Sequence, residues 1–100
     1  MRRFINIMQD NNLSDNDFRT IQNAREDLIG EIDAIMQYAN HLRQTSSLSA
    51  QITTRSIMEE EQVHVGELMA LLFKLDSGFK DRFDRGVKEF NDRLTINTRN

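Results

Sequence analysis

The stretch from Ile57 to Leu75 constrains the fold more than any other part of the chain. Its apolar residues follow one heptad seam with spacings of three and four, which predicts a long helix packed along another helix. The same seam passes through Glu61 and His64, which lie one above the other on a helix face. An unpaired charge on an apolar face is costly, so these two side chains need a partner. Glu-x-x-His is also the spacing by which one helix offers an oxygen and a nitrogen to a metal ion.

The composition favours a single all-α domain. The 100 residues include no Pro and four Gly, and the length allows only a modest core. The net charge of −3 provides no basic surface for nucleic acid, and no apolar run approaches the roughly 20 residues of a membrane span. The chain has no Cys, which excludes disulfides and thiolate metal sites. The segment from Met1 to Met8 is too short for a signal peptide, so we expect a cytoplasmic protein.

Hydrophobic periodicity predicts an antiparallel two-helix hairpin. Residues 1–13 are mostly polar, and we expect them to form a flexible N-terminal arm. Ser14 is suited to cap a first helix that runs to about Gln44. A short turn at 45–47 leads into a second helix that ends near Leu75. The first helix keeps a heptad pattern that is broken only at Arg25 and consists of Phe18, Ile21, Leu28, Ile32, Ile35, Ala39 and Leu42.

A third, shorter helix is expected after the hairpin and should reach about Leu94. Ser47 or Ser49 can cap the second helix, and Gly78 is suited to end it in a left-handed conformation. The predicted domain is therefore 14–94, with a C-terminal tail at 95–100. One face of the third helix is apolar and carries Phe79, Phe83, Val87, Phe90 and Leu94. We expect this face to join neighbouring dimers in an assembly larger than a dimer.

The first helix carries a carboxylate that matches the Glu-x-x-His pair. Glu31 borders its apolar face, three residues after Leu28. The turn centre lies near residue 46, so Glu31 and Glu61 are both about fifteen residues from it. In an antiparallel hairpin the two carboxylates are then expected at the same height on facing helices.

The number of ligands predicts a site shared between two chains. A ferritin-like di-iron bundle uses a Glu from each of two helices and Glu-x-x-His from each of the other two. With Glu31, Glu61 and His64 this chain supplies half of such a site, so a homodimer should form the complete four-helix bundle. Oxygen and imidazole ligands suit iron, with manganese or zinc as alternatives, and we expect two iron ions per dimer.

Several neighbouring residues have competing interpretations. A lone His on an apolar stripe is more often a core residue than a ligand, although Glu31 and Glu61 favour the metal site for His64. Asp33 and Glu60 are either outer ligands on a route for incoming cations or parts of a solvated face. Gly30 and Gly66 weaken their helices and would permit either close helix approach or a local bulge.

Two motifs resemble those of the encapsulated ferritins and related rubrerythrin-like half ferritins, of the ferritin-like superfamily. They are GEIDAIMQY from Gly30 to Tyr38 and MEEEQVHVGEL from Met58 to Leu68, and the resemblance covers about residues 20–94. It implies a hairpin that dimerises around a ferroxidase centre, with Tyr38 close to the metals and Asp33 associated with metal uptake. It also implies a ring of dimers, as in a decamer, and storage of iron inside an encapsulin nanocompartment. Gly30 and Gln37 depart from the family pattern at its uptake site.

The leading hypothesis is thus a di-iron ferroxidase that oxidises Fe²⁺ with O₂ or peroxide for iron storage or detoxification. A second hypothesis is a rubrerythrin-like di-iron or di-manganese enzyme that reduces peroxide. That enzyme would need an external reductant, because the chain has no Cys-based electron carrier. A third hypothesis is a metal-free helical scaffold or dimerisation module.

Overall fold

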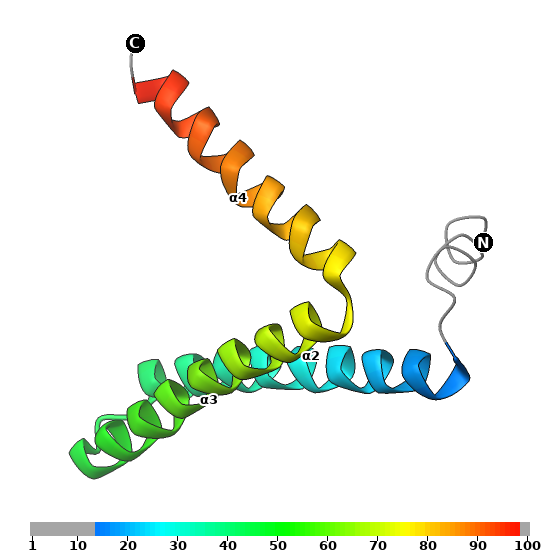
Figure 1. The fold of residues 1–100 in the computed structure, drawn as a ribbon. Helices are drawn as coiled ribbons and strands as arrows, with labels where there is room; N and C mark the ends of the chain where they lie inside the picture. Colours follow the sequence, from blue (N-terminus) through cyan, green and yellow to red (C-terminus); the bar gives the residue numbers. More distant parts are fainter. Residues whose placement is uncertain (1–13, 99–100) are drawn as a thin grey trace.

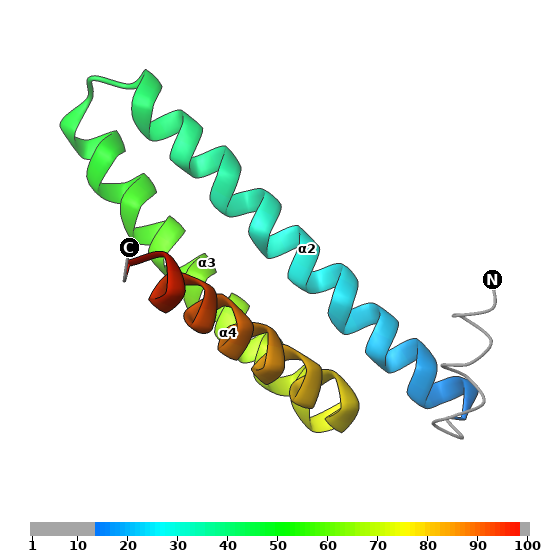
Figure 2. The same cartoon turned by 90° about the horizontal axis from the view of Figure 1, so that it is seen from above.

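The computed structural model describes residues 14–98, which form three α-helices. They are α2 (Asp15–Gln44), α3 (Leu48–Leu75) and α4 (Ser77–Thr98). α2 and α3 run side by side as an antiparallel hairpin, and α4 leaves its end at a steep angle (Figure 1). Figure 2 shows the same hairpin from above, with the turn at one end. The predicted all-α hairpin with a third helix is confirmed for this part of the chain, whereas the predicted arm at 1–13 lies outside the described residues.

Two serine caps fix where the hairpin helices begin. The hydroxyl of Ser14 accepts a hydrogen bond from the backbone N–H of Asp17 at 3.1 Å. The hydroxyl of Ser47 accepts one from the backbone N–H of Ala50 at 3.3 Å. Each serine thereby satisfies a first-turn N–H group that has no partner within its helix. Both helix starts agree with the sequence prediction, and of the two candidate caps for α3 it is Ser47 that acts.

Asp76 alone forms the joint between α3 and α4. Its backbone N–H donates to the carbonyl of Leu72 at 2.8 Å, and its Oδ1 accepts from the backbone N–H of Phe79 at 3.1 Å. One residue therefore ends α3 and caps α4. Gly78 lies inside the first turn of α4, so the predicted left-handed helix end at Gly78 is wrong. Asp76 satisfies both helix ends through its backbone and side chain, and no left-handed residue is needed.

α4 extends four residues past the predicted end at Leu94, so residues 95–98 are helical rather than a tail. Two ion pairs run along its polar side, Lys80 with Asp84 at 2.7 Å and Lys88 with Asp92 at 2.6 Å. In each pair the hydrogen bond to the carboxylate raises the pKa of the lysine above its ordinary value. These pairs are exposed, so they add little stability, but their i,i+4 spacing supports a continuous helix.

The buried core is small and lies at one end of the hairpin. Within the described residues it consists of Ile21, Ala24 and Leu72, against which Leu28, Leu75 and Phe79 pack. Arg25, which interrupts the heptad pattern, connects α2 to the joint between α3 and α4. Its guanidinium lies 3.7 Å from the Asp76 carboxylate and donates to Gln22 Oε1 at 2.6 Å. The core thus holds α2, α3 and the start of α4 together, far from the turn.

Much apolar surface remains exposed along the rest of the hairpin. Ile29, Met36, Ile52 and Val63 are each more than half exposed. The Cα radius of gyration is 18.3 Å, against about 13 Å for a compact chain of this length. No helix within residues 14–98 has the uninterrupted apolar length needed to cross a membrane. The single chain therefore buries only part of the surface that its heptad pattern makes available.

We expect Leu72→Ala to lower the free energy of unfolding by about 3 kcal/mol, because truncation of a buried Leu leaves a cavity. Leu72 is only 2% exposed. Ile52→Ala is the matched control, since Ile52 is 61% exposed on the same helix. Urea unfolding followed by circular dichroism at one fixed protein concentration gives both values. An equal loss in the two variants would show that the core does not lie at this end of the hairpin.

Candidate metal centre

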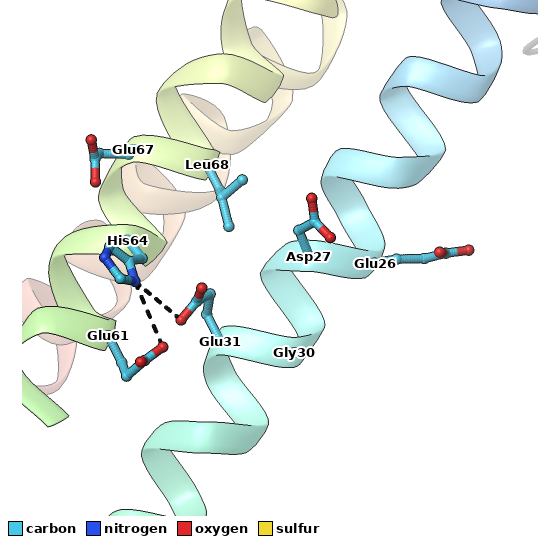
Figure 3. Close-up of a pocket in the computed structure, with 8 residues that line it drawn as sticks. All are labelled: Glu26, Asp27, Gly30, Glu31, Glu61, His64, Glu67 and Leu68. Atoms are coloured by element: carbon cyan, nitrogen blue, oxygen red, sulfur yellow. Dashed lines mark ion pairs between the residues drawn. The ribbon is translucent and has the colours of Figure 1, made fainter. Parts of the chain in front are cut away.

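Three potential metal ligands meet in the middle of the hairpin. Glu31 projects from α2 toward α3, while Glu61 and His64 project from α3 toward α2 (Figure 3). Both helices continue without a break through these positions. Because the rise per residue is constant in an α-helix, equal distances from the turn bring Glu31 and Glu61 to the same height. The structure therefore brings together the three residues that the sequence selected as ligands.

The distances suit one shared cation. His64 Nδ1 lies 3.5 Å from Glu31 Oε2 and 3.7 Å from Glu61 Oε2. One ligand atom from each residue can be chosen so that all three lie within 4.8 Å of one another. Metal–ligand bonds to nitrogen and carboxylate oxygen are about 2.0–2.2 Å long, so an ion placed between these atoms needs only small side-chain shifts.

The polar groups of this cluster are incompletely satisfied. Glu31 Oε2 is buried and has no hydrogen-bond partner, because its contact with His64 does not meet hydrogen-bond geometry. A buried carboxylate oxygen without a partner is costly. The side chains of Glu31 and Glu61 are 24% and 19% exposed, whereas His64 is 43% exposed. The donor set of two carboxylates and one imidazole fits a divalent cation, which would satisfy the orphaned oxygen.

The triad lies in an open pocket of about 580 Å³ that is strongly acidic. The pocket is lined by Glu26, Asp27, Gly30, Glu31, Glu61, His64, Glu67 and Leu68. Asp27 lies on α2 one turn before Glu31, whereas Glu26 points away from the triad (Figure 3). Five carboxylates line this pocket with a single imidazole, and their negative potential attracts cations to it.

The accessory residues predicted from the sequence lie apart from the triad. Asp33 is exposed, lines a separate hollow on α2 and accepts a hydrogen bond from Gln37 Nε2 at 3.0 Å. Tyr38 contacts the ring of His41 edge-on, with centroids 6.3 Å apart. Glu60 is exposed, and none of Asp33, Tyr38 and Glu60 lines the pocket of the triad. The accessory role predicted for these three residues therefore stays a prediction, since they are not part of the triad's pocket in the single chain.

Three carboxylates of the pocket, Glu26, Asp27 and Glu67, escaped the sequence analysis, and the last two lie one helical turn from a ligand. Asp27 precedes Glu31 by four residues, and Glu67 follows His64 by three. Both spacings place the side chain on the same helix face as a ligand. A search for acidic residues one turn away from each ligand would have found both.

The two helical glycines near the triad have no partner in this chain. A Cβ atom added at Gly30 or Gly66 would meet nothing within 4 Å. Both lie in continuous α-helix. Neither close approach of the two hairpin helices nor a local bulge therefore explains them.

Comparison with family models, with curated proteins and with solved structures finds no match to this chain. The functional interpretation accordingly depends on the residues of the triad and their geometry.

We expect Glu31→Gln to leave the metal-free protein as stable as before or to raise its free energy of unfolding by up to about 1 kcal/mol. The reason is that the substitution removes one of two adjacent carboxylate charges. Urea unfolding in the presence of a chelator measures this effect, and Glu26→Gln, which changes a carboxylate that points away from the triad, is the control. A clear loss of stability in Glu31→Gln alone would show that its ion pair with His64 is a structural contact.

Proposed function

We propose that this chain is an iron-binding ferroxidase in which Glu31, Glu61 and His64 supply half of a dinuclear site. A second copy of the chain supplies the other half. The observation that carries the proposal is the convergence of two carboxylates and an imidazole, from two facing helices, to within 4.8 Å.

The choice of metal follows from the ligand types. Carboxylate and imidazole ligands without thiolates are typical of non-haem iron, and manganese and zinc accept the same set. Glu61 and His64 are one helical turn apart on α3, while Glu31 comes from α2. This is half of the arrangement found in ferritin-like di-iron bundles, where each pair of helices contributes one Glu and one Glu-x-x-His.

The surface around His64 supports a second chain as the missing half. Ile57, His64 and Leu71 are seven residues apart and thus form one row along the same side of α3. Ile57 and Leu71 are 38% and 41% exposed, and His64 lies between them. An apolar row of this kind is stabilised when it is covered by a partner helix. A second hairpin on this side would bury the row and bring its own three ligands to the same place.

In this proposal Fe²⁺ is the substrate. Two Fe²⁺ ions give two electrons to O₂, which takes up two protons and leaves as hydrogen peroxide, while two Fe³⁺ ions remain. The chain has to bind and orient both ions and to balance their additional charge. The carboxylates of Glu31 and Glu61 provide the negative charge, and the imidazole of His64 provides a nitrogen donor. No nucleophile is required, because the electron transfer belongs to the metal.

The metal-free scaffold is the second candidate, and one observation favours it. His64 Nδ1 lies between two carboxylates, so a protonated imidazole would bring a positive charge to the cluster without any metal. The exposed apolar row on α3 would then serve dimerisation alone. Metal analysis of protein purified without oxygen distinguishes the two candidates.

We expect His64→Ala and Glu61→Ala to slow Fe²⁺ oxidation by at least about 10–100-fold, since loss of residues that merely orient metal ligands already has effects of this size. Stopped-flow absorbance of Fe³⁺ formation is the measurement. His41→Ala and Glu59→Ala are matched controls, because both residues are exposed and lie outside the pocket. Unchanged rates in His64→Ala and Glu61→Ala would rule out the assignment of these ligands.

We also expect metal binding and dimerisation to be linked, because the complete site exists only in the dimer. At a free metal concentration of about one hundred times the dissociation constant, binding would stabilise the dimer by about 2.7 kcal/mol. Native mass spectrometry with and without Fe²⁺ should show two metal ions in the dimer and a larger dimer fraction. A monomer that retains two ions would exclude the shared site.

A further inference from the structure

α4 carries an apolar stripe that is only partly covered within residues 14–98. Its first part packs on its own chain, since the ring centroids of Phe79 and Phe83 lie 5.4 and 5.1 Å from that of Phe73. Beyond that cluster the stripe is open, with exposed fractions of 46% at Val87, 60% at Phe90 and 48% at Leu94. These residues follow one another at spacings of three and four, so they form a straight line along the helix.

α2 carries an apolar hollow that is also uncovered. The hollow has a volume of about 410 Å³ and is lined by Glu26, Ile29, Gly30, Ile32, Asp33 and Met36. Its three apolar side chains are highly exposed, at 67% for Ile29, 46% for Ile32 and 60% for Met36. Glu26 and Asp33 add carboxylates to this surface. It is therefore an apolar surface with an acidic edge.

The charges of the two surfaces are complementary. The hairpin from 14 to 76 carries eleven acidic and five basic residues, whereas α4 carries four acidic and five basic residues. At 100° per residue, Arg82 and Arg93 fall on the same side of the α4 stripe, with Glu89 beside them, so this edge keeps a net positive charge. Opposite charges at the edges of an apolar contact favour its formation and fix its orientation.

Two glycines add an independent argument for close helix contact. Gly86 borders the α4 stripe on the side of Arg82 and Arg93, and Gly30 lines the α2 hollow. A Cβ atom at either position would meet nothing in the same chain. Glycine weakens a helix interior relative to alanine, and no contact within the single chain compensates for this loss of stability. Close contact with a helix from another chain at these positions would compensate for it.

A second copy of the chain is the occupant that fits both surfaces. α4 projects away from its own hairpin, so its C-terminal part (orange to red) does not reach its own α2 (Figure 1). If two α4 helices instead paired antiparallel about a twofold axis, Arg82 and Arg93 of both copies would lie on the same edge, and their like charges would repel. We propose that α4 of one copy docks with its apolar stripe in the α2 hollow of a second copy. This contact goes beyond the metal site and needs no metal.

Disulfide trapping tests the contact directly, because the chain has no native Cys. Phe90→Cys chains and mass-tagged Ile32→Cys chains are expressed together, purified with a chelator and oxidised under mild conditions. In the control, mass-tagged Ile52→Cys chains replace the Ile32→Cys chains. We expect the yield of mixed disulfide with Ile32→Cys to be about tenfold higher than in this control, because a disulfide requires closely placed Cβ atoms. Ile52 is exposed to the same degree as Phe90 but lies outside both surfaces.

Two other products would overturn the proposal. Predominant disulfides between two Phe90→Cys chains would show that α4 pairs with itself. An internal disulfide in a chain with both substitutions would show that α4 folds back on its own hairpin. If Phe90→Cys fails to fold, Val87→Cys replaces it with the same expected result. Since the experiment is metal-free, its outcome is independent of the ferroxidase proposal.

Gly86→Ala provides a second measurement, with Gly66→Ala as its matched control. Both substitutions improve helix propensity, and neither creates a clash in the single chain. We expect sedimentation velocity to show weaker association only for Gly86→Ala, whose new methyl group borders the stripe. Unchanged association of Gly86→Ala, together with absence of the mixed disulfide, would refute the contact.

Discussion

The placement of Glu31, Glu61 and His64 across the middle of the hairpin is the constraint on which the rest of the structure depends. Two carboxylates at this position repel each other and cannot be buried in an apolar core without compensation. The core is accordingly displaced to one end of the hairpin, where Ile21 and Leu72 are buried. An open acidic pocket occupies the centre instead. The centre of the hairpin is therefore less buried than its end, but it carries a group of side chains that could bind a cation.

In the proposed function, this arrangement would make folding, metal binding and association parts of one equilibrium. A hairpin with so few buried residues has little stability of its own, because packing of apolar faces provides most of the stability of helices in proteins. A cation between the carboxylates would remove their repulsion, and a second chain would cover the row of Ile57, His64 and Leu71. Each event favours the other, since both stabilise only the folded form. The exposed surface of the single chain thus has a physical role in the proposed dimer.

The sequence predicts the hairpin and its triad well, because both depend on local spacing. Heptad positions and serine caps define the helices, and equal distances from the turn place Glu31 level with Glu61. The end of the second helix near Leu75 was predicted correctly, but Gly78 was assigned the role that Asp76 has. That role depends on three contacts that only the folded chain creates, including the ion pair with Arg25. The surroundings of Asp33 likewise depend on the folded chain. Its position on α2 places it beside the exposed side chains of Ile29, Ile32 and Met36, outside the pocket of the triad.

The direction of α4 determines what the second contact would build. The proposed contact around the triad would be isologous, since each copy would contribute the same surface, and it would pair two chains. Contact between α4 and the α2 hollow is heterologous, and repeated heterologous contacts close into rings or continue as filaments according to the rotation between neighbours. That rotation is set by the angle at which α4 leaves the hairpin. Asp76 forms this joint, and its ion pair with Arg25 connects the joint to α2. A single residue therefore connects the small core of the chain to the geometry of the assembly.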